Sequence, residues 1–406
     1  MAENGAVLMG CAPVPVLPDG NVMDNGAMGD GITDDTAAIY RTLARITASR
    51  AATSGGRLVS APLYFPAGYT FKYTSDLVWQ SVINPVIVGY GATLLASGTN
   101  FTKAGLLVDG AYRAVIRGLT FAGDGTEQVP SAFKLDNSTA GFEVTTGCSL
   151  ADVTIAGMKY VTGLDLSGTG ARQLDGCQFD NVLVAGQQGP GAWSSSGNWQ
   201  NGILLGNGTF GNNYDHCGRG LQCAGHYTNY NVNVSSLSID GAQPANGFLD
   251  FSIVPGAQCS FRNIQSQNAN QLLAVSGFAP IPVTLEDIDL KSVYLNASSY
   301  IAQLTGGMVR LKNIGASNLV NTGGSSYVTG VVSAGGDGAG RPCTLSVDQL
   351  CAYGLKTAAI VPVPGAGQAN IVCANYANYN PNTGQYTTVA GDVLSAYSGT
   401  SWTNLV

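Results

Sequence analysis

A short strand-like triplet that recurs along most of the chain is the feature that most constrains the fold. Successive triplets begin 34, 24, 60, 27, 24 and 26 residues apart. A repeat of about 20–50 residues that contains such alternation is typical of a solenoid, in which each coil buries its apolar side chains against the next coil. The triplets are Leu119–Phe121, Val153–Ile155, Cys177–Phe179, Leu237–Ile239, Ile264–Ser266, Ile288–Leu290 and Ile314–Ala316.

The interval of 60 residues is long enough for one more coil, whose triplet we place at Asn213–Asp215. The loose period is expected, since insertions at turns cost little free energy and lie on the surface. A second strand follows the triplet in most coils. These second strands are Phe133–Leu135, Leu164–Leu166, Ile203–Leu205, Leu221–Cys223, Phe248–Phe251 and Leu272–Val275.

The residue just before each triplet is small or carries a short polar side chain. Side chains of this kind bond to nearby backbone in turns, so the pattern predicts a recurrent turn whose polar side chains stack from coil to coil. We therefore interpret Asp152 and Asp287 as structural residues. The residues at this position are Gly118, Asp152, Gly176, Ser236, Asn263, Asp287 and Asn313.

The segment GDGITDDTAAI, residues 29–39, combines a glycine turn with the start of a helix. Glycine accepts positive φ, and Thr33, Asp34 and Asp35 are favoured residues at a helix N-terminus. Apolar residues then recur at three- and four-residue spacing, which predicts an amphipathic helix near residues 34–50. The run LYFPAG, residues 63–68, is a short strand closed by a turn. We interpret the aspartates of this segment as helix caps and not as catalytic groups.

The order of these segments resembles the opening of the pectate-lyase-like superfamily, and most closely its branch of phage tailspikes and capsule depolymerases. In that family a GDG-x-TDDT-x-AI segment forms a helix that covers the end of the solenoid, and YFPAG begins the first coil. The resemblance covers Asn25 to Leu95. It implies an all-β fold, a single-stranded right-handed parallel β-helix over residues 23–375 with the capping helix near 34–50.

The same resemblance implies a virion tail or extracellular location, a polysaccharide and other virion proteins as partners, and a homotrimer. Residues 1–22 are punctuated by Pro and Gly and lack periodicity, so we interpret them as an N-terminal tail or attachment segment. Residues 376–406 are rich in Asn, Tyr and Thr and are interpreted as a small β tail, for which the resemblance implies a role in oligomerisation. The N-terminal residues lack the basic start and long apolar core of a secretory signal. No stretch reaches the roughly 18 apolar residues of a membrane span, so we expect no membrane insertion.

The composition of the chain indicates which kinds of partner it can bind. The net charge is −7, which disfavours a nucleic acid because binding one needs many cationic side chains. Charged residues make up 11% of the chain, well below the usual share of about 25%. The nine cysteines are odd in number and lack the short spacing of a zinc site. We therefore interpret them as small buried side chains, and we expect no metal and no cofactor.

Three aspartates form the candidate catalytic group. Aligning the triplets places Asp180, Asp215 and Asp240 at one outward position of successive coils. Neighbouring coils lie about 4.8 Å apart, so the carboxylates would stand about 5 and 10 Å from one another. Glycosidases use carboxyl pairs about 5–5.5 Å or about 6.5–9.5 Å apart. The column predicts acid-catalysed hydrolysis of a polysaccharide, and the alternative is a solvated acidic face without chemistry.

Candidate substrate-binding residues lie beside this column. A long insertion at residues 186–200 holds Trp193 and Trp199, whose indoles can stack on sugar rings. The alternative is that they pack on the solenoid wall or on another subunit. His216 follows the middle aspartate directly, and Arg219 lies four residues after it. We interpret the second histidine, His226, as structural.

Two other functions stay open. A non-catalytic virion protein or adhesin would use the same rod without an acid pair. A bacterial polysaccharide lyase would use the acids to hold calcium and a base such as Arg219, Lys159 or Arg172 to take a proton. The family's arginine signature for pectate lyases is absent, as are the NTD and RIK motifs of polygalacturonases. We therefore rank hydrolysis first and the lyase last.

Overall fold

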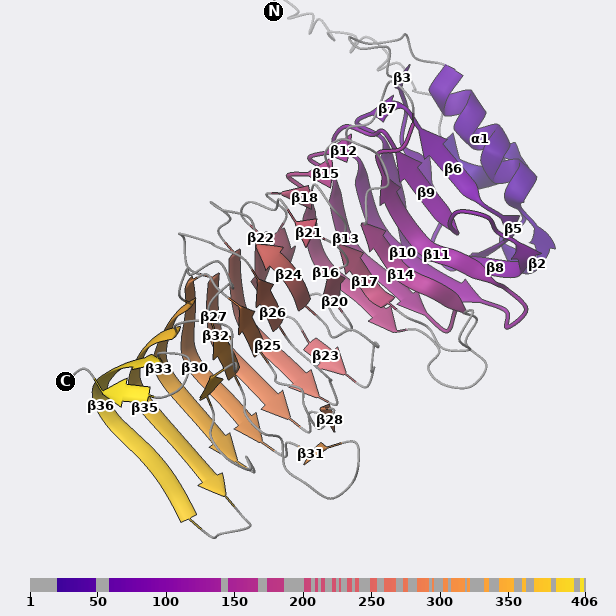
Figure 1. Cartoon of the computed structure of the whole chain (residues 1–406). Helices are drawn as coiled ribbons and strands as arrows, with labels where there is room; N and C mark the ends of the chain where they lie inside the picture. Colours follow the sequence, from indigo (N-terminus) through magenta and orange to yellow (C-terminus); the bar gives the residue numbers. More distant parts are fainter. Residues whose placement is uncertain are drawn as a thin grey trace, which may run out of the picture.

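The computed structural model describes residues 20–48, 58–139, 145–166 and 174–185, and from residue 201 onward a series of strands, mostly by their backbone. Figure 1 shows strands stacked along one axis into a rod. The fold is the predicted single-stranded right-handed parallel β-helix, with one helix at its N-terminal end. Within the described residues, no helix combines the length and the apolar composition of a membrane crossing.

The longest sheet, which we name sheet A, runs the length of the rod. Its strands are β1 (Gly20–Asn21), β2 (Asp30–Asp34), β4 (Leu63–Tyr64), β5 (Thr70–Ser75), β8 (Val86–Asn100), β10 (Val115–Gly123), β13 (Ser149–Ala156), β16 (Gln178–Ala185), β19 (Asn213–Asp215), β22 (Val232–Ser235), β23 (Ser238–Asp240), β25 (Cys259–Gln267), β27 (Val283–Lys291), β30 (Met308–Ser317), β33 (Cys343–Tyr353), β35 (Ala369–Asn380), β36 (Gln385–Tyr397) and β37 (Trp402–Asn404).

The other sheets close the coils. Sheet C contains β6 (Leu77–Gln80), β9 (Leu106–Asp109), β11 (Val129–Asp136), β14 (Tyr160–Leu166), β17 (Asn201–Leu205) and β20 (Leu221–Cys223). A further sheet contains β21 (His226–Tyr227), β24 (Leu249–Ile253), β26 (Leu273–Ser276), β29 (Ala302–Thr305), β32 (Val332–Gly335) and β34 (Ile360–Pro362). Short strands pair at the corners, namely β12 (Thr145–Thr146), β15 (Leu174–Asp175) and β18 (Thr209–Phe210), β3 (Leu58–Val59) with β7 (Val82–Ile83), and β28 (Tyr294–Leu295) with β31 (Val320–Asn321).

The core consists of inward side chains that stack from coil to coil. On sheet A, Phe121 lies opposite Ile155, and both are fully buried. The ring of Phe121 also packs against Phe133 of sheet C, with centroids 6.0 Å apart. Cys148 and Cys177 are buried free thiols, which confirms their interpretation as small core side chains. Each coil therefore adds a slice of apolar core that is complete only when its neighbours are in place.

A corner divides each well-described long strand of sheet A into two segments. The corner residue has positive φ in five coils: 72° at Gly118, 55° at Asp152 and 51° at Asn181 in three successive coils, and 55° at Asp287 and 52° at Asn313 farther along the rod. The left-handed conformation interrupts the inward and outward alternation, so that two successive residues face solvent. In β13 these are Ala151 and Asp152, between the buried Leu150 and Val153.

The corner corrects the alignment of the triplets. Phe179 pairs with Leu150 and not with Ile155, and the residue of this coil at the corner is Asn181. Gly176, which the alignment placed in the ladder, also has positive φ but belongs to an earlier corner, beside Gly147. The error arose because both segments of a long strand carry the same apolar and polar alternation.

Helix α1 (Thr36–Ala48) covers the N-terminal end of the rod, as predicted, and follows the short 3-10 turn η1 (Val22–Asn25). The Asp34 carboxylate accepts a hydrogen bond from the Thr36 N–H at 3.0 Å. Asp35 accepts from the N–H groups of Met28 and Gly29 at 2.7 and 3.1 Å. Asp34 therefore caps the first helical N–H, as predicted. Asp35 is not a helix cap, because its carboxylate holds the turn that precedes the helix, but it is structural.

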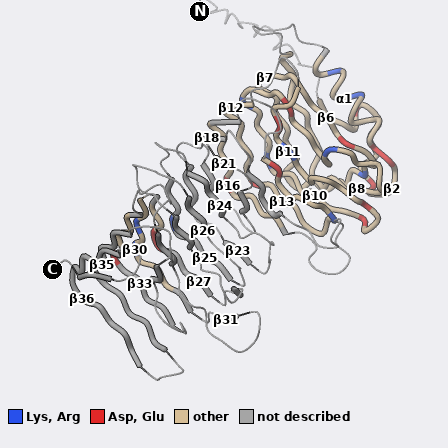
Figure 2. The backbone as a smooth tube through the Cα atoms, in the orientation of Figure 1, with Lys and Arg blue, Asp and Glu red and all other residues tan. Residues whose placement is uncertain are grey.

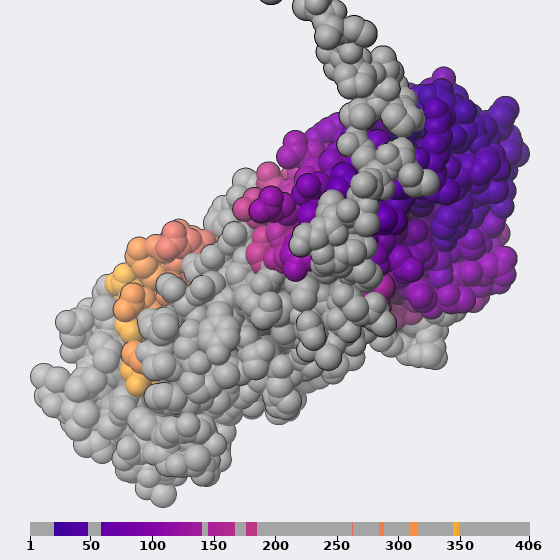
Figure 3. Space-filling model, turned by 90° about the horizontal axis from the view of Figure 1, so that it is seen from above, coloured from indigo at the N-terminus to yellow at the C-terminus, as the bar shows by residue number. Residues whose placement is uncertain are grey.

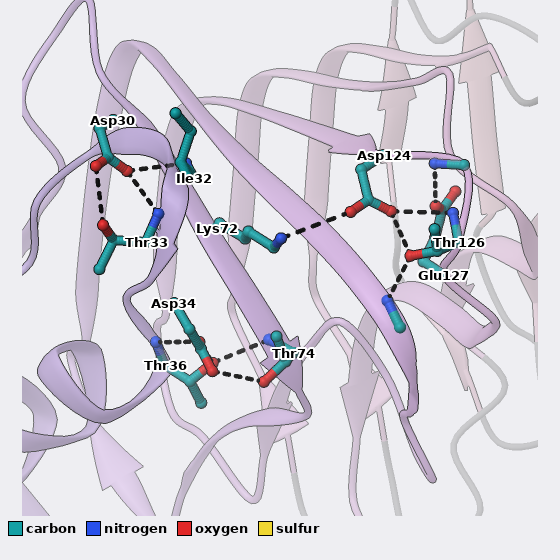
Figure 4. A network of polar contacts seen from close by, with 12 residues as sticks. Asp30, Ile32, Thr33, Asp34, Thr36, Lys72, Thr74, Asp124, Thr126 and Glu127 are labelled. Carbon is teal, nitrogen blue, oxygen red and sulfur yellow. Dashed lines mark hydrogen bonds and ion pairs between the residues drawn. The ribbon is translucent and has the colours of Figure 1, made fainter.

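A polar network connects this capping segment to the first coils (Figure 4). Asp34 also accepts from the Thr74 hydroxyl of β5 at 2.8 Å. On the same strand, Lys72 lies 3.8 Å from Asp124, which follows β10.

Charged side chains elsewhere are sparse, and Figure 2 shows uncharged residues along most of the described coils. In the space-filling view of Figure 3 the described N-terminal coils, indigo to magenta, lie packed together at one end of the molecule.

The C-terminal end of the rod changes its pairing. β35 pairs in parallel with β33, and this pairing reaches Tyr379. β36 then pairs antiparallel with β35, and β37 antiparallel with β36. The parallel stack thus ends with β35, a few residues beyond the predicted boundary at residue 375. The oligomerisation role of this segment stays a prediction, and the predicted attachment segment lies almost wholly outside the described residues.

We predict that Phe121→Ala destabilises the rod by about 3–5 kcal/mol, because it leaves a cavity where a fully buried ring packs against Phe133. Urea unfolding followed by circular dichroism measures the change. Leu183→Ala on β16 is the control, since this leucine is 43% exposed and should change stability by about 0.5 kcal/mol or less. Equal effects of the two substitutions would contradict the assignment of inward and outward positions.

Candidate functional site

Two of the three candidate aspartates lie side by side. Asp180 of β16 is the direct partner of Asp215 of β19 in parallel pairing. Partners on adjacent parallel strands lie about 4.8 Å apart. The side chain of Asp180 is exposed on the outer face of sheet A. For Asp215 the structure describes the strand and its register. The sequence correctly predicted this pair.

The third aspartate lies elsewhere on its coil. The next partner of Asp215 is Ser235 of β22, whereas Asp240 of β23 pairs with Gln267. The predicted three-acid column is therefore wrong in its third member, because Asp240 follows the interruption between β22 and β23 and Asp215 is aligned with the segment before it. Whether Asp240 acts in catalysis stays a prediction.

The acid pair belongs to an outward column that can be followed through the paired registers. Further along the rod the column contains ion pairs: Arg262 lies 3.4 Å from Glu286, and the Lys312 ammonium contacts the same carboxylate. Opposite charges there stabilise neighbouring strands, whereas like charges at directly opposed positions destabilise them. A purely structural column would therefore not favour the Asp180–Asp215 pair. The column reads Tyr64, Val88, Arg117, Ala151, Asp180, Asp215, Ser235, Arg262, Glu286 and Lys312.

Beside this column runs the predicted polar ladder at the corner. Asn181 donates a hydrogen bond to Asp152 at 2.7 Å, and the Tyr90 hydroxyl donates to its other oxygen at 3.0 Å. Farther along, Asn313 donates to Asp287 at 2.7 Å. These contacts confirm the structural interpretation of both aspartates. The hydrogen bond from Asn181, followed by that from Tyr90, lowers the pKa of Asp152 below its usual range.

A cluster of a lysine and two aspartates on sheet C was missed by the sequence analysis. The Lys134 ammonium lies 3.2 Å from Asp136 and 3.7 Å from Asp165, and Ser131 donates a hydrogen bond to Asp165 at 2.9 Å. All three charged side chains are nearly buried. Lys134 and Asp165 are the middle residues of the triplets Phe133–Leu135 and Leu164–Leu166. Charged residues at matching positions of two second strands were the available signal.

This cluster has the chemistry of a structural ion group. Two carboxylates share one ammonium, and burial makes each charge depend on its partner. Glycosidase chemistry requires carboxyls that reach a polymer, and these oxygens are directed at Lys134. We therefore place the candidate functional site on the exposed face of sheet A.

The remaining predicted site residues lie outside the described residues. They are Trp193, Trp199, His216 and Arg219. Their roles in substrate binding stay predictions.

We predict that Lys134→Met destabilises the protein by about 3–5 kcal/mol, because it leaves two nearly buried carboxylates without their ammonium. Thermal and urea unfolding measure the loss. Lys103→Met is the matched control, since Lys103 is exposed and its backbone N–H, not its ammonium, binds Asp76. A neutral effect of Lys134→Met would show that the cluster does not stabilise sheet C.

The ladder predicts a pH dependence of stability. Because folding lowers the pKa of Asp152, its stabilising contribution is present above the unfolded pKa and disappears as pH falls through the folded pKa. Asp152→Asn should therefore weaken the loss of stability below about pH 4. Carbon NMR titration of the carboxylate should give a pKa that returns toward its ordinary value in Tyr90→Phe. An unchanged titration in that variant would contradict the hydrogen bond.

Comparisons with known proteins agree with this architecture. Residues 20–272 match the model of a family described as rhamnogalacturonase A/epimerase, pectate lyase-like. The structure of the ORF18 protein of Geobacillus virus E2 is similar, with 11% identity, a TM-score of 0.50, and coverage of 95% of this chain and 75% of that one. A comparison with curated proteins found no match.

Two enzymes with lower TM-scores are also similar in structure. The A-module of the mannuronan C-5 epimerase AlgE6 from Azotobacter vinelandii has 14% identity, a TM-score of 0.42, and coverage of 85% of this chain and 100% of that one. The catalytic unit of a GH87 α-1,3-glucanase from Streptomyces thermodiastaticus has 14% identity, a TM-score of 0.44, and coverage of 86% and 67%. The family model matches well over half of the residues of this chain. The chain therefore belongs to the rhamnogalacturonase A/epimerase, pectate lyase-like family.

Proposed function

We propose that the protein binds a bacterial cell-surface polysaccharide on the outer face of sheet A and hydrolyses it, as a trimeric component of a phage tail. The observation that carries the proposal is the direct pairing of Asp180 with Asp215 in adjacent coils. The family is described by enzymes that act on polysaccharides, which supports a polysaccharide as the substrate. The opening segment resembles that of phage tailspikes, which supports the tail role.

The spacing of the pair suits a retaining hydrolase. Strand partners lie about 4.8 Å apart, close to the roughly 5–5.5 Å between the carboxyls of retaining glycosidases. One aspartic acid protonates the glycosidic oxygen as the bond to the anomeric carbon breaks, and the other carboxylate forms an ester with that carbon. Water then cleaves the ester and gives its proton to the first carboxylate. Trp193, Trp199, His216 and Arg219 hold the sugar chain in this proposal.

Two alternatives remain as outcomes of the test. A rod without catalysis would bind the polymer and release no reducing ends. A lyase would release products that carry an unsaturated uronate, which absorbs ultraviolet light. Neither alternative needs the two aspartates to act as an acid and a nucleophile.

We predict that Asp180→Asn and Asp215→Asn each lower the release of reducing ends at least about a hundredfold, because each removes one of two required carboxyls. Polysaccharides from candidate host bacteria serve as substrates, and the thermal unfolding of each variant verifies its fold. Asp24→Asn is the control, since Asp24 is an exposed aspartate on η1 at the N-terminal end.

Asp240→Asn separates two arrangements of the site. We predict retained activity, because Asp240 pairs with Gln267 and not with Asp215. Loss of activity would contradict a site made of two acids. Full activity in both Asp180→Asn and Asp215→Asn would overturn the proposed hydrolysis.

A further inference from the structure

The outward column that contains the acid pair continues toward the N-terminus and carries aromatic side chains there. Register pairing connects Tyr64 to Val88, Arg117, Ala151, Asp180 and Asp215 in successive coils. At a coil spacing of about 4.8 Å, this column extends over about 24 Å along the rod. An extended chain of several sugar units fits such a length.

Two exposed tyrosines stand at the start of this surface. Tyr64 is 42% exposed and Tyr90 is 49% exposed. They lie one coil apart and two strand positions from each other, because Val88 is the partner of Tyr64. Such diagonal neighbours are about 7–8 Å apart. Two aromatic side chains at this spacing offer successive platforms for sugar rings.

The ring of Tyr90 is held in place before any ligand arrives. Its hydroxyl donates a hydrogen bond to Asp152 across the intervening coil. Below the ring lies Gly118, where a Cβ atom would stand 2.4 Å from the Tyr90 Cδ1 atom. Glycine at this corner therefore leaves the space that the Tyr90 ring occupies. A side chain that is already ordered loses little entropy when it binds a ligand.

The residues between the tyrosines and the acid pair are suited to hydroxyl groups. Arg117 offers N–H donors and Asp180 offers carboxylate oxygens, and both side chains are exposed. Asn181 and Asp152, also exposed, bond to each other beside them and keep further donor and acceptor capacity. Between Arg117 and Asp180 the column holds only the small Ala151. The surface is thus low at its centre, and polar groups of both kinds lie beside it.

The charges on this surface favour a neutral polymer over an anionic one. Arg117 is the only cation among the column residues from Tyr64 to Asp215, while Asp152 and Asp180 carry exposed carboxylates and the register places Asp215 opposite Asp180. An anionic chain would meet like charge at the acid pair. A neutral polymer meets no electrostatic repulsion there. Its hydroxyl groups can hydrogen-bond both to the donors and to the acceptors of this surface. Because the internal strands of sheet A are paired on both sides, addition of a peptide strand has no free edge to use here.

We propose that the column from Tyr64 to Asp180, together with Tyr90 and Asp152 at the corner, is a binding track for a neutral linear polysaccharide. The track leads the polysaccharide to the Asp180–Asp215 pair, so the proposal of a track rests on the proposed function. Tyr64 and Tyr90 stack on sugar rings that lie several units from the scissile bond. Contacts of this kind bind the polymer without taking part in the reaction.

Affinity electrophoresis in native gels tests the track. The gels contain dextran, galactomannan or xyloglucan as neutral probes, or polygalacturonate or alginate as anionic probes. We expect a neutral polymer to retard the protein, and Tyr64→Ala and Tyr90→Ala to weaken this retardation at least about tenfold in apparent Kd. Ala151→Trp should act in the same direction by filling the low centre of the track. Tyr90→Phe keeps the ring and should bind more tightly than Tyr90→Ala.

Tyr40→Ala is the matched control, because Tyr40 is also a partly exposed tyrosine, at 38%, but lies on helix α1. It should bind like the wild type. For a polymer that is cleaved, Tyr90→Ala should raise KM with little change in kcat, whereas Asp180→Asn lowers kcat. Thermal unfolding of each variant separates a binding defect from a folding defect.

The outcomes distinguish the two proposals. If no polymer retards or is cleaved by the wild type, both the proposed function and the track are overturned. If a polymer retards the wild type, Tyr64→Ala and Tyr90→Ala equally, the track is overturned and the proposed function stands. Retardation by anionic probes alone would overturn the neutral substrate. Loss of trimer formation in the tyrosine variants, with unchanged polymer binding, would assign this surface to a protein partner.

Discussion

Parallel pairing of each coil with the next is the constraint on which the rest of the structure depends. The backbone hydrogen bonds fix which residues face one another, so one register determines every inward and outward column. Leu150, for example, lies between Ile116 and Phe179, and all three are buried. The same register that aligns this core aligns the surface residues one position away. Core packing and site geometry are therefore consequences of a single pairing.

The corner determines which residues of each coil lie on the surface. A positive φ at Asp152 and Asn181 interrupts the alternation, so two neighbouring residues of each coil point outward. One becomes part of the column that contains the acid pair, and the other becomes part of the polar ladder. The ladder orders Tyr90 through Asp152. A structural device of the backbone thus places aromatic, polar and acidic side chains along one line of the rod.

The fold was predictable because its signals are local and repeated. The capping segment needed only the hydrogen bonds of Asp34 and Asp35 to nearby N–H groups. The pairing of Asp180 with Asp215 was also predictable from the triplets. The three-acid column failed because Asp180 and Asp215 lie in the first segment of the long strand, whereas Asp240 lies in the second segment, opposite Gln267. The two segments look alike in sequence, and only the corner tells them apart. The Lys134 cluster was missed because its residues meet across two strands, and a strand's partner must be known before its charges can be paired.

The most direct measurement of the central claim is the distance between the two paired aspartates. In the double variant Asp180→Cys and Asp215→Cys, the Cα separation of about 4.8 Å lies within the range of about 4.4–6.8 Å that disulfides span. Mild oxidation followed by peptide mass mapping should find this cross-link in high yield. The account predicts no cross-link in the double variant Asp180→Cys and Asp240→Cys. A cross-link in the second variant and none in the first would contradict the register on which the site is built.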